Sequence, residues 1–324
     1  MKLRLLPART GLAWVAEGLS VFRRQPLRLT ALLALYLLVG GLLAVFPVVG
    51  AALSVAMAPF LMVVLMAGTG LVADGRRIPL EITWVLFRGK YAPQGLELLK
   101  LGGVCAAGLM LLLAASLAVD GGSFWRIYSG QEVPTPEILS DRRVQIAFWL
   151  VTLPGLLASA LLWFAPGLVY WLRLPMAQAI FYSVVACGRN LGAMAVYALT
   201  WGGIAVALVI AGTLLTYLLL IVGLPPSLAA IVYLVGMLMY STAVLTSATF
   251  AFRDTFDALD ELERQGRLPR QPQGCWTLVT DAYDRLIVTT LPRGNATWDA
   301  PASWGRGYLH KSVIPVIPAQ AGIQ

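Results

Sequence analysis

Residues 29–73 read LTALLALYLLVGGLLAVFPVVGAALSVAMAPFLMVVLMAGTGLVA, a run of forty-five residues without one Asp, Glu, Lys, Arg or His. A second charge-free run of sixty-two residues extends from Leu191 to Phe252. One helix needs about 20 residues to cross the roughly 30 Å hydrocarbon layer of a bilayer, because each residue adds about 1.5 Å. Each run is long enough for two crossings, so the sequence predicts an all-α, multi-pass membrane protein.

The composition agrees with this class and argues against several others. Hydrophobic residues make up 59% of the chain, charged residues 12%, and the mean hydropathy is +0.77, whereas soluble domains are about 25% charged. The net charge of +8 is spread over several loops, so nucleic-acid binding is not expected. Three cysteines without CxxC spacing and the single histidine His310 predict neither a disulfide framework nor a metal or cofactor site.

Six spans account for most of the chain. The predicted spans are about Leu29–Phe46, Val48–Ala73, Leu101–Val119, Val144–Leu172, one crossing within Leu191–Leu224, and Ser227–Phe252. Pro225-Pro226 separates the last two, because two successive prolines cannot continue a helix. We therefore expect a polytopic transmembrane helical bundle over residues 29–265, which follows an amphipathic cytoplasmic leader over residues 1–28 and ends in a short cytoplasmic helix.

Basic residues are distributed unequally between the two sides of these spans. Thirteen Lys and Arg residues lie before span 1 and in the loops after spans 2 and 4, whereas three lie in the loops on the opposite side. Basic loops are retained in the cytoplasm. The sequence therefore predicts a multi-pass membrane protein with both termini in the cytoplasm, and an even number of spans agrees with that orientation.

Three segments between the spans are amphipathic rather than plainly polar. They are Thr10–Arg24, Pro79–Lys90 and Pro175–Arg189. Each could be a short helix in the inner headgroup region or a helical connector packed on the bundle, and the alternation in the second segment also fits a strand. The first and third resemble each other, with Arg24-Gln25 before span 1 and Arg189-Asn190 before span 5, which suggests a duplicated unit.

A search for chemistry finds little to support an enzyme. None of the predicted spans contains an ionisable residue, which argues against proton-coupled transport, and the chain has no GxSxG, P-loop or HExxH motif. Four carboxylates, Asp120, Glu132, Glu137 and Asp141, lie in the loop between spans 3 and 4, where their spacing is typical of a solvated loop. We predict no catalytic, cofactor-binding or metal-binding residue.

Helix-breaking and small residues inside the spans have two interpretations. Pro59, Pro154 and Pro166 could free carbonyl groups for a ligand, although packing kinks are the more common role of proline in membrane helices. The ridge Gly203-x3-Ala207-x3-Ala211 favours close approach of two helices, within the chain or between copies. A homo-oligomer or a membrane protein partner would use such a ridge.

Three stretches carry a family resemblance. They are the leader from Pro7-Ala8-Arg9 through Trp14 to Phe22-Arg23-Arg24-Gln25-Pro26, the connector from Ser183 to Gly188-Arg189-Asn190-Leu191, and the exit from span 6 at Thr249–Phe256. With them, residues 1–265 resemble a family of multi-pass inner-membrane proteins of Gram-negative bacteria. The layout is similar to the membrane-anchoring domain beside some glycerophosphodiester phosphodiesterase domains, without the catalytic domain. The resemblance implies fold and topology and brings no activity.

The tail departs from this family. Residues 266–324 contain Pro, Gly and Trp without long periodicity, and we expect them to be disordered. The ending VIPVIPAQAGIQ, residues 313–324, resembles the translation of a dispersed bacterial repeat element that has entered a reading frame.

The leading hypothesis for function is a non-enzymatic accessory or lipid-interacting membrane component. Its basis is the basic inner face, where we predict that Arg23, Arg24, Arg76 and Arg77 lie near anionic lipid headgroups. The alternative is a permease for a neutral or hydrophobic solute. A membrane-bound enzyme would require a convergent cluster of Asp, Arg and Ser at the outer interface.

The predicted orientation can be tested by labelling in a chain whose native cysteines are replaced by alanine. Because the loop between spans 3 and 4 is expected outside, Gln131→Cys should react with a membrane-impermeant maleimide in intact cells. Gly89→Cys, in the basic loop between spans 2 and 3, should react only after lysis. The opposite labelling pattern would place both termini outside.

Overall fold

A computed structural model describes residues 3–43, 45–79, 81–85, 92–223 and 225–256, all within one compact unit. The predicted helix after span 6, the tail 266–324 and its repeat-like ending lie outside the described residues. The helices are α1 (Thr10–Phe22), α2 (Pro26–Leu43), α3 (Pro47–Ala73), α4 (Ile82–Val85), α5 (Ala92–Asp120), α6 (Ser123–Tyr128), α7 (Pro136–Ser140), α8 (Arg142–Leu161), α9 (Ala165–Trp171), α10 (Met176–Arg189), α11 (Leu191–Ile221) and α12 (Pro226–Thr255).

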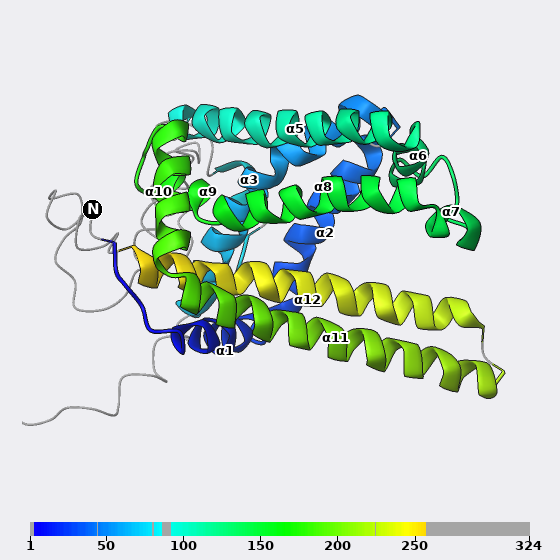
Figure 1. Ribbon diagram of the computed structural model, residues 1–324. Helices are drawn as coiled ribbons and strands as arrows, with labels where there is room; N and C mark the ends of the chain where they lie inside the picture. The colour runs from blue at the N-terminus through cyan, green and yellow to red at the C-terminus, as the bar shows by residue number, and fades with distance from the viewer. Residues whose placement is uncertain (1–2, 44, 80, 86–91, 224, 257–324) are drawn as a thin grey trace, which may run out of the picture. The chain divides into compact units, whose positions relative to one another are not determined.

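The expected fold class is confirmed. Within the described ranges the only extended pairing is an isolated bridge between Leu3 and Phe256. Six helical segments are long and apolar enough to cross a bilayer: Pro26–Leu43, Val48–Ala73, Pro93–Asp120, Arg142–Trp171, Leu191–Ile221 and Ser227–Thr255. The chain is therefore an all-α, polytopic helical bundle with six spans (Figure 1).

The observed helices differ from the predicted bounds mainly at spans 1, 3 and 4. Span 3 begins at Pro93 instead of Leu101, because α5 continues through Glu97 and Lys100, whose side chains pair at 2.5 Å. Span 1 begins at Pro26 instead of Leu29, and span 4 consists of two helices, α8 and α9. Span 5 is one continuous helix of 31 residues, in agreement with the single crossing predicted there. The charged residues of the longer helices all lie outside the predicted spans, near helix ends: Arg28 in α2, Glu97, Lys100 and Asp120 in α5, Arg142 and Arg143 in α8, and Arg253 and Asp254 in α12. A membrane helix can be longer than the hydrocarbon layer is thick when its last turns extend into polar surroundings.

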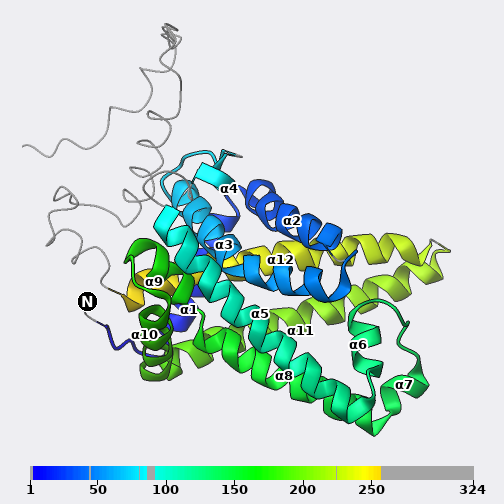
Figure 2. The same ribbon diagram turned by 90° about the horizontal axis from the view of Figure 1, so that it is seen from above.

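The spans associate in two groups. Helices α2, α3, α5 and α8 pack in succession, and α11 and α12 form an antiparallel pair. This pair diverges from α8 in the direction of the turn that joins α11 to α12 (Figure 2). We call the end of the bundle that contains α10 and the carboxyl ends of α3 and α12 the basic end. Helices α6 and α7 lie at the opposite end (Figure 1). Most of the protein core lies near the basic end.

Helix α1 packs on the bundle, as the second of its two predicted arrangements requires. Trp14 is fully buried, and the α1 face that carries it contacts α11 and α12. Two glycines make this contact close. A Cβ on Gly11 would lie 2.3 Å from the carbonyl oxygen of Ala193, and one on Gly18 would lie 2.6 Å from the Cα of Ser247.

Beneath α1, a hydrogen-bonded group joins α11 to α12. The hydroxyl groups of Tyr197 and Ser247 are 2.7 Å apart, and the Trp201 indole N–H donates to Ser247 at 3.1 Å. The Tyr197 ring also meets Trp14 edge to face at 6.0 Å. Because these polar groups are buried and paired with each other, they specify how the two helices align.

Aromatic side chains form the centre of the core at the basic end. Phe164 and Phe256 meet edge to face at 5.5 Å, and Phe252 lies 5.3 Å from Phe256. Gly167 in α9 makes room for Phe252, because a Cβ there would lie 2.7 Å from the ring. The carboxyl end of α12 is thereby packed against α9.

The opposite half of the α11–α12 pair has little protein around it. The buried residues of α11 are Ala193, Tyr197 and Trp201, all in its first three turns, while Leu214 and Ile221 are 63% and 83% exposed. In a bilayer such side chains contact acyl chains, which are as apolar as leucine, so protein packing there brings no hydrophobic gain.

The structure also shows how the other two amphipathic segments fold. In 79–90 the described helix is α4, Ile82–Val85, with no strand among the described residues there. Helix α10 runs across the ends of the spans rather than along them (Figure 1). Its buried face contains Ala179, Ser183 and Ala186, while Phe181 and Tyr182 are exposed. It combines a packed face with an aromatic face suited to the interface.

The close contact of α1 predicts a large effect of one methyl group. Gly18→Ala should lower the free energy of unfolding by about 1–3 kcal/mol, because backbone atoms of Ser247 cannot move aside independently. Gly203→Ala is the control, since a Cβ there meets nothing within 4 Å. The measurement is unfolding in mixed micelles by titration with a denaturing detergent. Equal stabilities of the two variants would contradict the packing of α1.

Candidate functional site

The predicted lipid-contact residues come from two segments that the structure brings together. Arg23 and Arg24 follow α1, and Arg76 and Arg77 follow α3. The side chain of Gln25 donates to the carbonyl oxygen of Arg76 at 2.7 Å. The α1–α2 junction is thus bound directly to the segment after α3, and the four predicted arginines lie on these two joined segments.

Not all of these arginines are equivalent. Arg24 donates to the carbonyl oxygen of Ala73, the last residue of α3, at 3.1 Å, and Arg28 donates to that of Ile78 at 3.2 Å. These bonds satisfy carbonyl groups at and beyond a helix end, where a cation is also favoured by the helix dipole. All four of Arg23, Arg24, Arg28 and Arg77 are exposed at the surface. Arg24 has a structural role that the sequence did not reveal, and Arg28 belongs to the same group.

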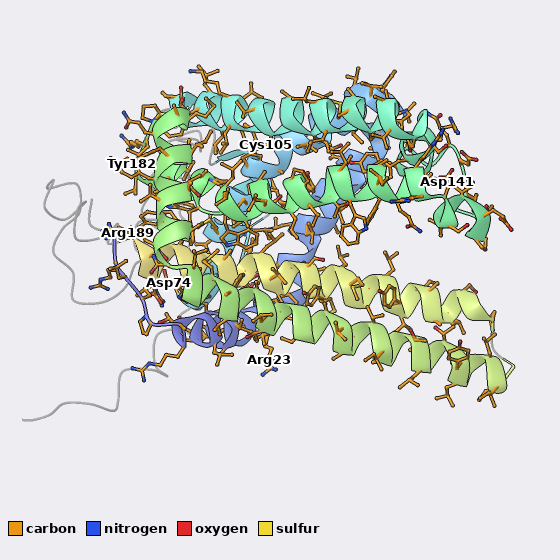
Figure 3. All side chains as sticks on the ribbon, in the orientation of Figure 1. Arg23, Asp74, Cys105, Asp141, Tyr182 and Arg189 are labelled. Carbon is orange, nitrogen blue, oxygen red and sulfur yellow. The ribbon has the colours of Figure 1, made fainter. Side chains whose placement is uncertain are left out.

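We call Arg23, Arg24, Arg28, Arg76 and Arg77 the basic cluster. Asp74 is the one carboxylate within residues 23–28 and 73–78, and it lies at the basic end (Figure 3). Partial desolvation raises the pKa of Asp74 above its ordinary value, even though Arg76 attracts the charged form. The cluster therefore keeps a strong positive charge, which increases as Asp74 takes up a proton.

A second cluster of charged side chains joins α1 to the carboxyl end of α12. Arg253 pairs with Glu17 at 2.9 Å and with Asp254 at 2.8 Å. The indole N–H of Trp14 donates to Asp254 at 3.0 Å. Sequence reasoning missed this group, although Trp14, Arg253 and Asp254 all belong to the stretches that carried the family resemblance.

Asn190, from the third of those stretches, completes the same assembly. Its side chain accepts from the backbone N–H of Leu6 at 2.9 Å and donates to the carbonyl oxygen of Arg4 at 3.1 Å. Gln25 and Asn190, the amides at the two similar junctions, thus both bind the backbone of a distant segment. The three stretches that carry the family resemblance therefore come together in the fold, and these contacts hold the leader to the bundle.

The interruption of span 4 is closed by α10. The Ser183 hydroxyl accepts from the backbone N–H of Phe164 at 3.1 Å and donates to the carbonyl oxygen of Leu161 at 2.7 Å. The Cys187 thiol lies 3.3 Å from the carbonyl oxygen of Ala160. The backbone groups of Ala160, Leu161 and Phe164 between α8 and α9 are therefore bound by α10, whereas the buried indole N–H of Trp163 has no hydrogen-bond partner among the described residues.

The carboxylates of the outer loop have structural partners. Asp120 accepts from the backbone N–H of Gly122 at 2.9 Å, and Asp141, at the start of α8 (Figure 3), accepts from that of Arg143 at 2.8 Å. Glu132 pairs with Arg126 at 2.8 Å, and Glu137 is exposed. The two aspartates satisfy donors at helix starts, so these residues behave as a folded polar loop.

Two further features of the described residues bear on reactivity, namely the distribution of metal-ligating side chains and the burial of the Cys187 thiol. No group of three or more His, Cys, Asp or Glu side chains there could hold a metal ion. Burial raises the pKa of the Cys187 thiol to about 11. Since the thiolate is the nucleophilic form, this cysteine is suited to packing rather than to covalent chemistry.

These features define a polytopic α-helical membrane protein with six bilayer-length helices. A probable inner membrane protein of Burkholderia thailandensis is 35% identical to the chain over 208 residues, which cover 63% of this chain and 77% of the relative. The chain belongs to the family of that inner-membrane protein. No protein-family profile and no solved structure matches the chain. The expected inner-membrane class is confirmed, and the orientation of the termini stays a prediction.

The closure of span 4 predicts a specific role for one hydroxyl group. Ser183→Ala should lower the free energy of unfolding by about 1–3 kcal/mol, because a buried N–H and a buried carbonyl group lose their partner. Ser159→Ala is the matched control, since that exposed hydroxyl bonds within its own helix to Gly155. Unfolding in mixed micelles compares the two. A Ser183→Ala protein as stable as the control would contradict this role.

Proposed function

We propose that the protein is a non-enzymatic, lipid-interacting component of the inner membrane that binds anionic headgroups through its basic cluster. The observation that carries the proposal is the joining of the α1–α2 junction to the segment after α3. That joining places five arginines on two adjoining segments, at the start of α2 and just beyond the end of α3. A basic residue close to an anionic bilayer surface contributes about 1 kcal/mol to the attraction.

The internal contacts of the cluster support this role. Arg24 and Arg28 already bind backbone carbonyl groups, so the segment that carries Arg76 and Arg77 is anchored rather than loose. Preorganised cations lose less conformational freedom when they bind a ligand. Arg23 and Arg77, which are exposed, would supply the main contacts to phosphate groups.

The structural roles of other charges favour a non-enzymatic component. The aspartates of the outer loop bind backbone donors, and Glu17, Arg253 and Asp254 join α1 to α12. These are uses in folding rather than in a reaction. The likeness in layout to the membrane anchor beside glycerophosphodiester phosphodiesterase domains stays a prediction, as does a homo-oligomer or a membrane protein partner.

The proposal predicts that removal of charges from the basic cluster lowers the selectivity of the protein for anionic lipid. The double variant Arg23→Gln and Arg77→Gln should reduce the enrichment of phosphatidylglycerol over phosphatidylcholine by about tenfold or more, at about 1 kcal/mol for each lost charge. Enrichment is measured by mass spectrometry of lipids that co-purify with the full chain from vesicles of equal composition.

The matched control removes the same net charge from the opposite end. Arg142→Gln with Arg143→Gln alters the two exposed arginines that begin α8 and should leave the enrichment within twofold of that of the unaltered chain. An equal loss in both double variants would indicate a general charge effect. No loss in the Arg23 and Arg77 variant would refute binding of headgroups by the basic cluster.

A further inference from the structure

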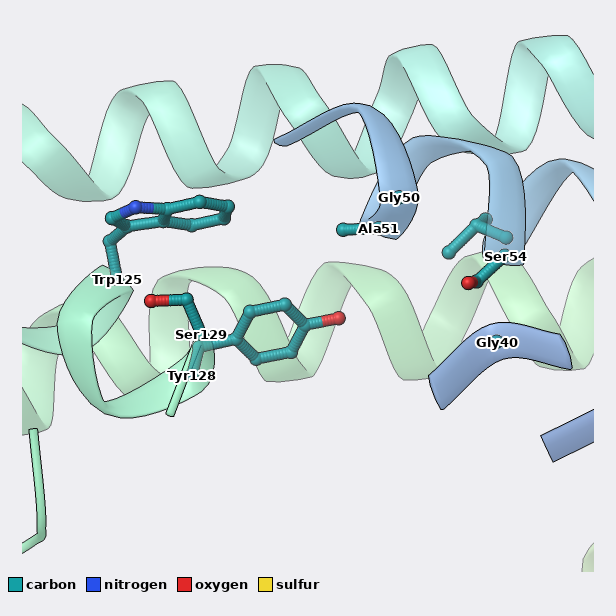
Figure 4. Close-up of a pocket in the computed structure, with 8 residues that line it drawn as sticks. Gly40, Gly50, Ala51, Ser54, Trp125, Tyr128 and Ser129 are labelled. Carbon is teal, nitrogen blue, oxygen red and sulfur yellow. The ribbon is translucent and has the colours of Figure 1, made fainter. Parts of the chain in front are cut away.

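A cavity of about 220 Å³ lies at the end of the bundle opposite the basic cluster. It is lined by Gly40 of α2, by Gly50, Ala51, Ser54 and Val55 of α3, and by Trp125, Tyr128 and Ser129 in and after α6. Figure 4 shows Trp125 and Tyr128 on one side, facing Ala51 and Ser54 on the other. The two walls come from segments about seventy residues apart in the sequence, so only the folded chain forms this site.

Several polar groups of the lining are unused by the protein. Among the described residues, the Ser54 hydroxyl, the Tyr128 hydroxyl and the Trp125 indole N–H have no hydrogen-bond partner. The Tyr36 hydroxyl, by contrast, already donates to the carbonyl oxygen of Ser54 at 2.6 Å. The lining therefore offers free donors and acceptors on otherwise apolar walls, which is the usual chemistry of a small-ligand site.

The backbone of α3 is also irregular beside the cavity. Pro59 lies inside α3 and has no N–H, so the carbonyl group of Val55, four residues earlier, lacks its ordinary helical donor. Val55 is a lining residue. A broken hydrogen-bond ladder at membrane depth is tolerated where it is covered by protein or faces a polar space. Pro59 thus leaves a carbonyl group of a lining residue without its ordinary donor.

Charge and size restrict the ligand. None of the eight lining residues is Asp, Glu, Lys, Arg or His, and the nearby Arg126 is paired with Glu132, so the lining has no partner for a phosphate or carboxylate. An apolar cavity of about 150 Å³ accommodates benzene, and this one is larger. Trp and Tyr side chains at a bilayer interface suit ligands that are apolar at one end and polar at the other.

We propose that this cavity binds an uncharged amphiphile, a molecule whose ring-sized or short acyl body carries hydroxyl or ester oxygens. Tyr128, Ser54 and Trp125 bind the oxygens, and Ala51 and Val55 contact the apolar body. The glycerol-ester region of a membrane lipid and a free aromatic or aliphatic alcohol share this chemistry. The site is separate from the basic cluster and does not depend on the function proposed for it.

Photolabelling of the full chain in vesicles of phosphatidylethanolamine and phosphatidylglycerol tests the proposal. One probe is a benzyl alcohol that carries a trifluoromethyl diazirine, and the other is a phosphatidylethanolamine with a diazirine next to an acyl ester. We expect saturable labelling of the peptides that contain Ser54 and Tyr128. Ala51→Trp, which fills the cavity, should reduce it at least fivefold.

Two controls separate the cavity from general contact with lipid. Leu53→Trp adds the same side chain at a neighbouring position that is 45% exposed, and it should change the labelling less than twofold. Labelling of the exposed α8 residues Leu153 and Leu156 should be the same in all variants. If Ala51→Trp alters that α8 labelling, the smaller change Tyr128→Phe decides, with an expected loss of at least threefold.

The outcomes distinguish the sources of the ligand. Cavity labelling by the lipid probe would identify the lipid ester region, and labelling by the alcohol alone would identify a free solute. Labelling that does not saturate, or that survives both Ala51→Trp and Tyr128→Phe, would overturn the proposal. The basic cluster is tested by lipid enrichment, so failure at one site leaves the other unaffected.

Discussion

The structure depends on one constraint, which is that backbone N–H and carbonyl groups cannot remain unpaired in or beside the hydrocarbon layer. Span 4 leaves its helical path between α8 and α9, and the Ser183 hydroxyl binds both the N–H of Phe164 and the carbonyl group of Leu161. This closure fixes α10 across the basic end. It also allows α9 to be buried, so that Phe164 can meet Phe256 and Gly167 can receive Phe252.

The distribution of packing follows from the two environments of the bundle. Near the basic end, water is close and burial of apolar surface is favourable, so Trp14 and the aromatic side chains of α9 and α12 form a dense core. Farther into the bilayer, lipid competes equally with protein for apolar side chains, and most of α11 beyond Trp201 is exposed. The protein therefore resembles a membrane bundle that is organised by a compact cap at one end.

The candidate sites could be found in the sequence only in part. Four arginines were identified because basic residues beside spans are visible as a charge pattern, but the bonds of Arg24 and Arg28 to carbonyl groups depend on where α3 ends in space. The cavity was hidden because its walls come from α3 and α6, which have no periodicity in common. Pro59 was the one available signal, and it could not be distinguished from an ordinary kink until Val55 was seen to line the cavity.

The sequence by itself determined the class of the protein, the number of spans and the basic side, because hydropathy and charge act locally and need no knowledge of neighbours. It could not determine that span 3 starts at Pro93, that span 4 is interrupted, or that α1 lies on the bundle. Those features depend on contacts between distant residues, such as Glu97 with the N–H of Met176 and Gly18 with Ser247. Only the tertiary structure decided them, since a polar group or a glycine acquires its role from the partner that the fold brings to it.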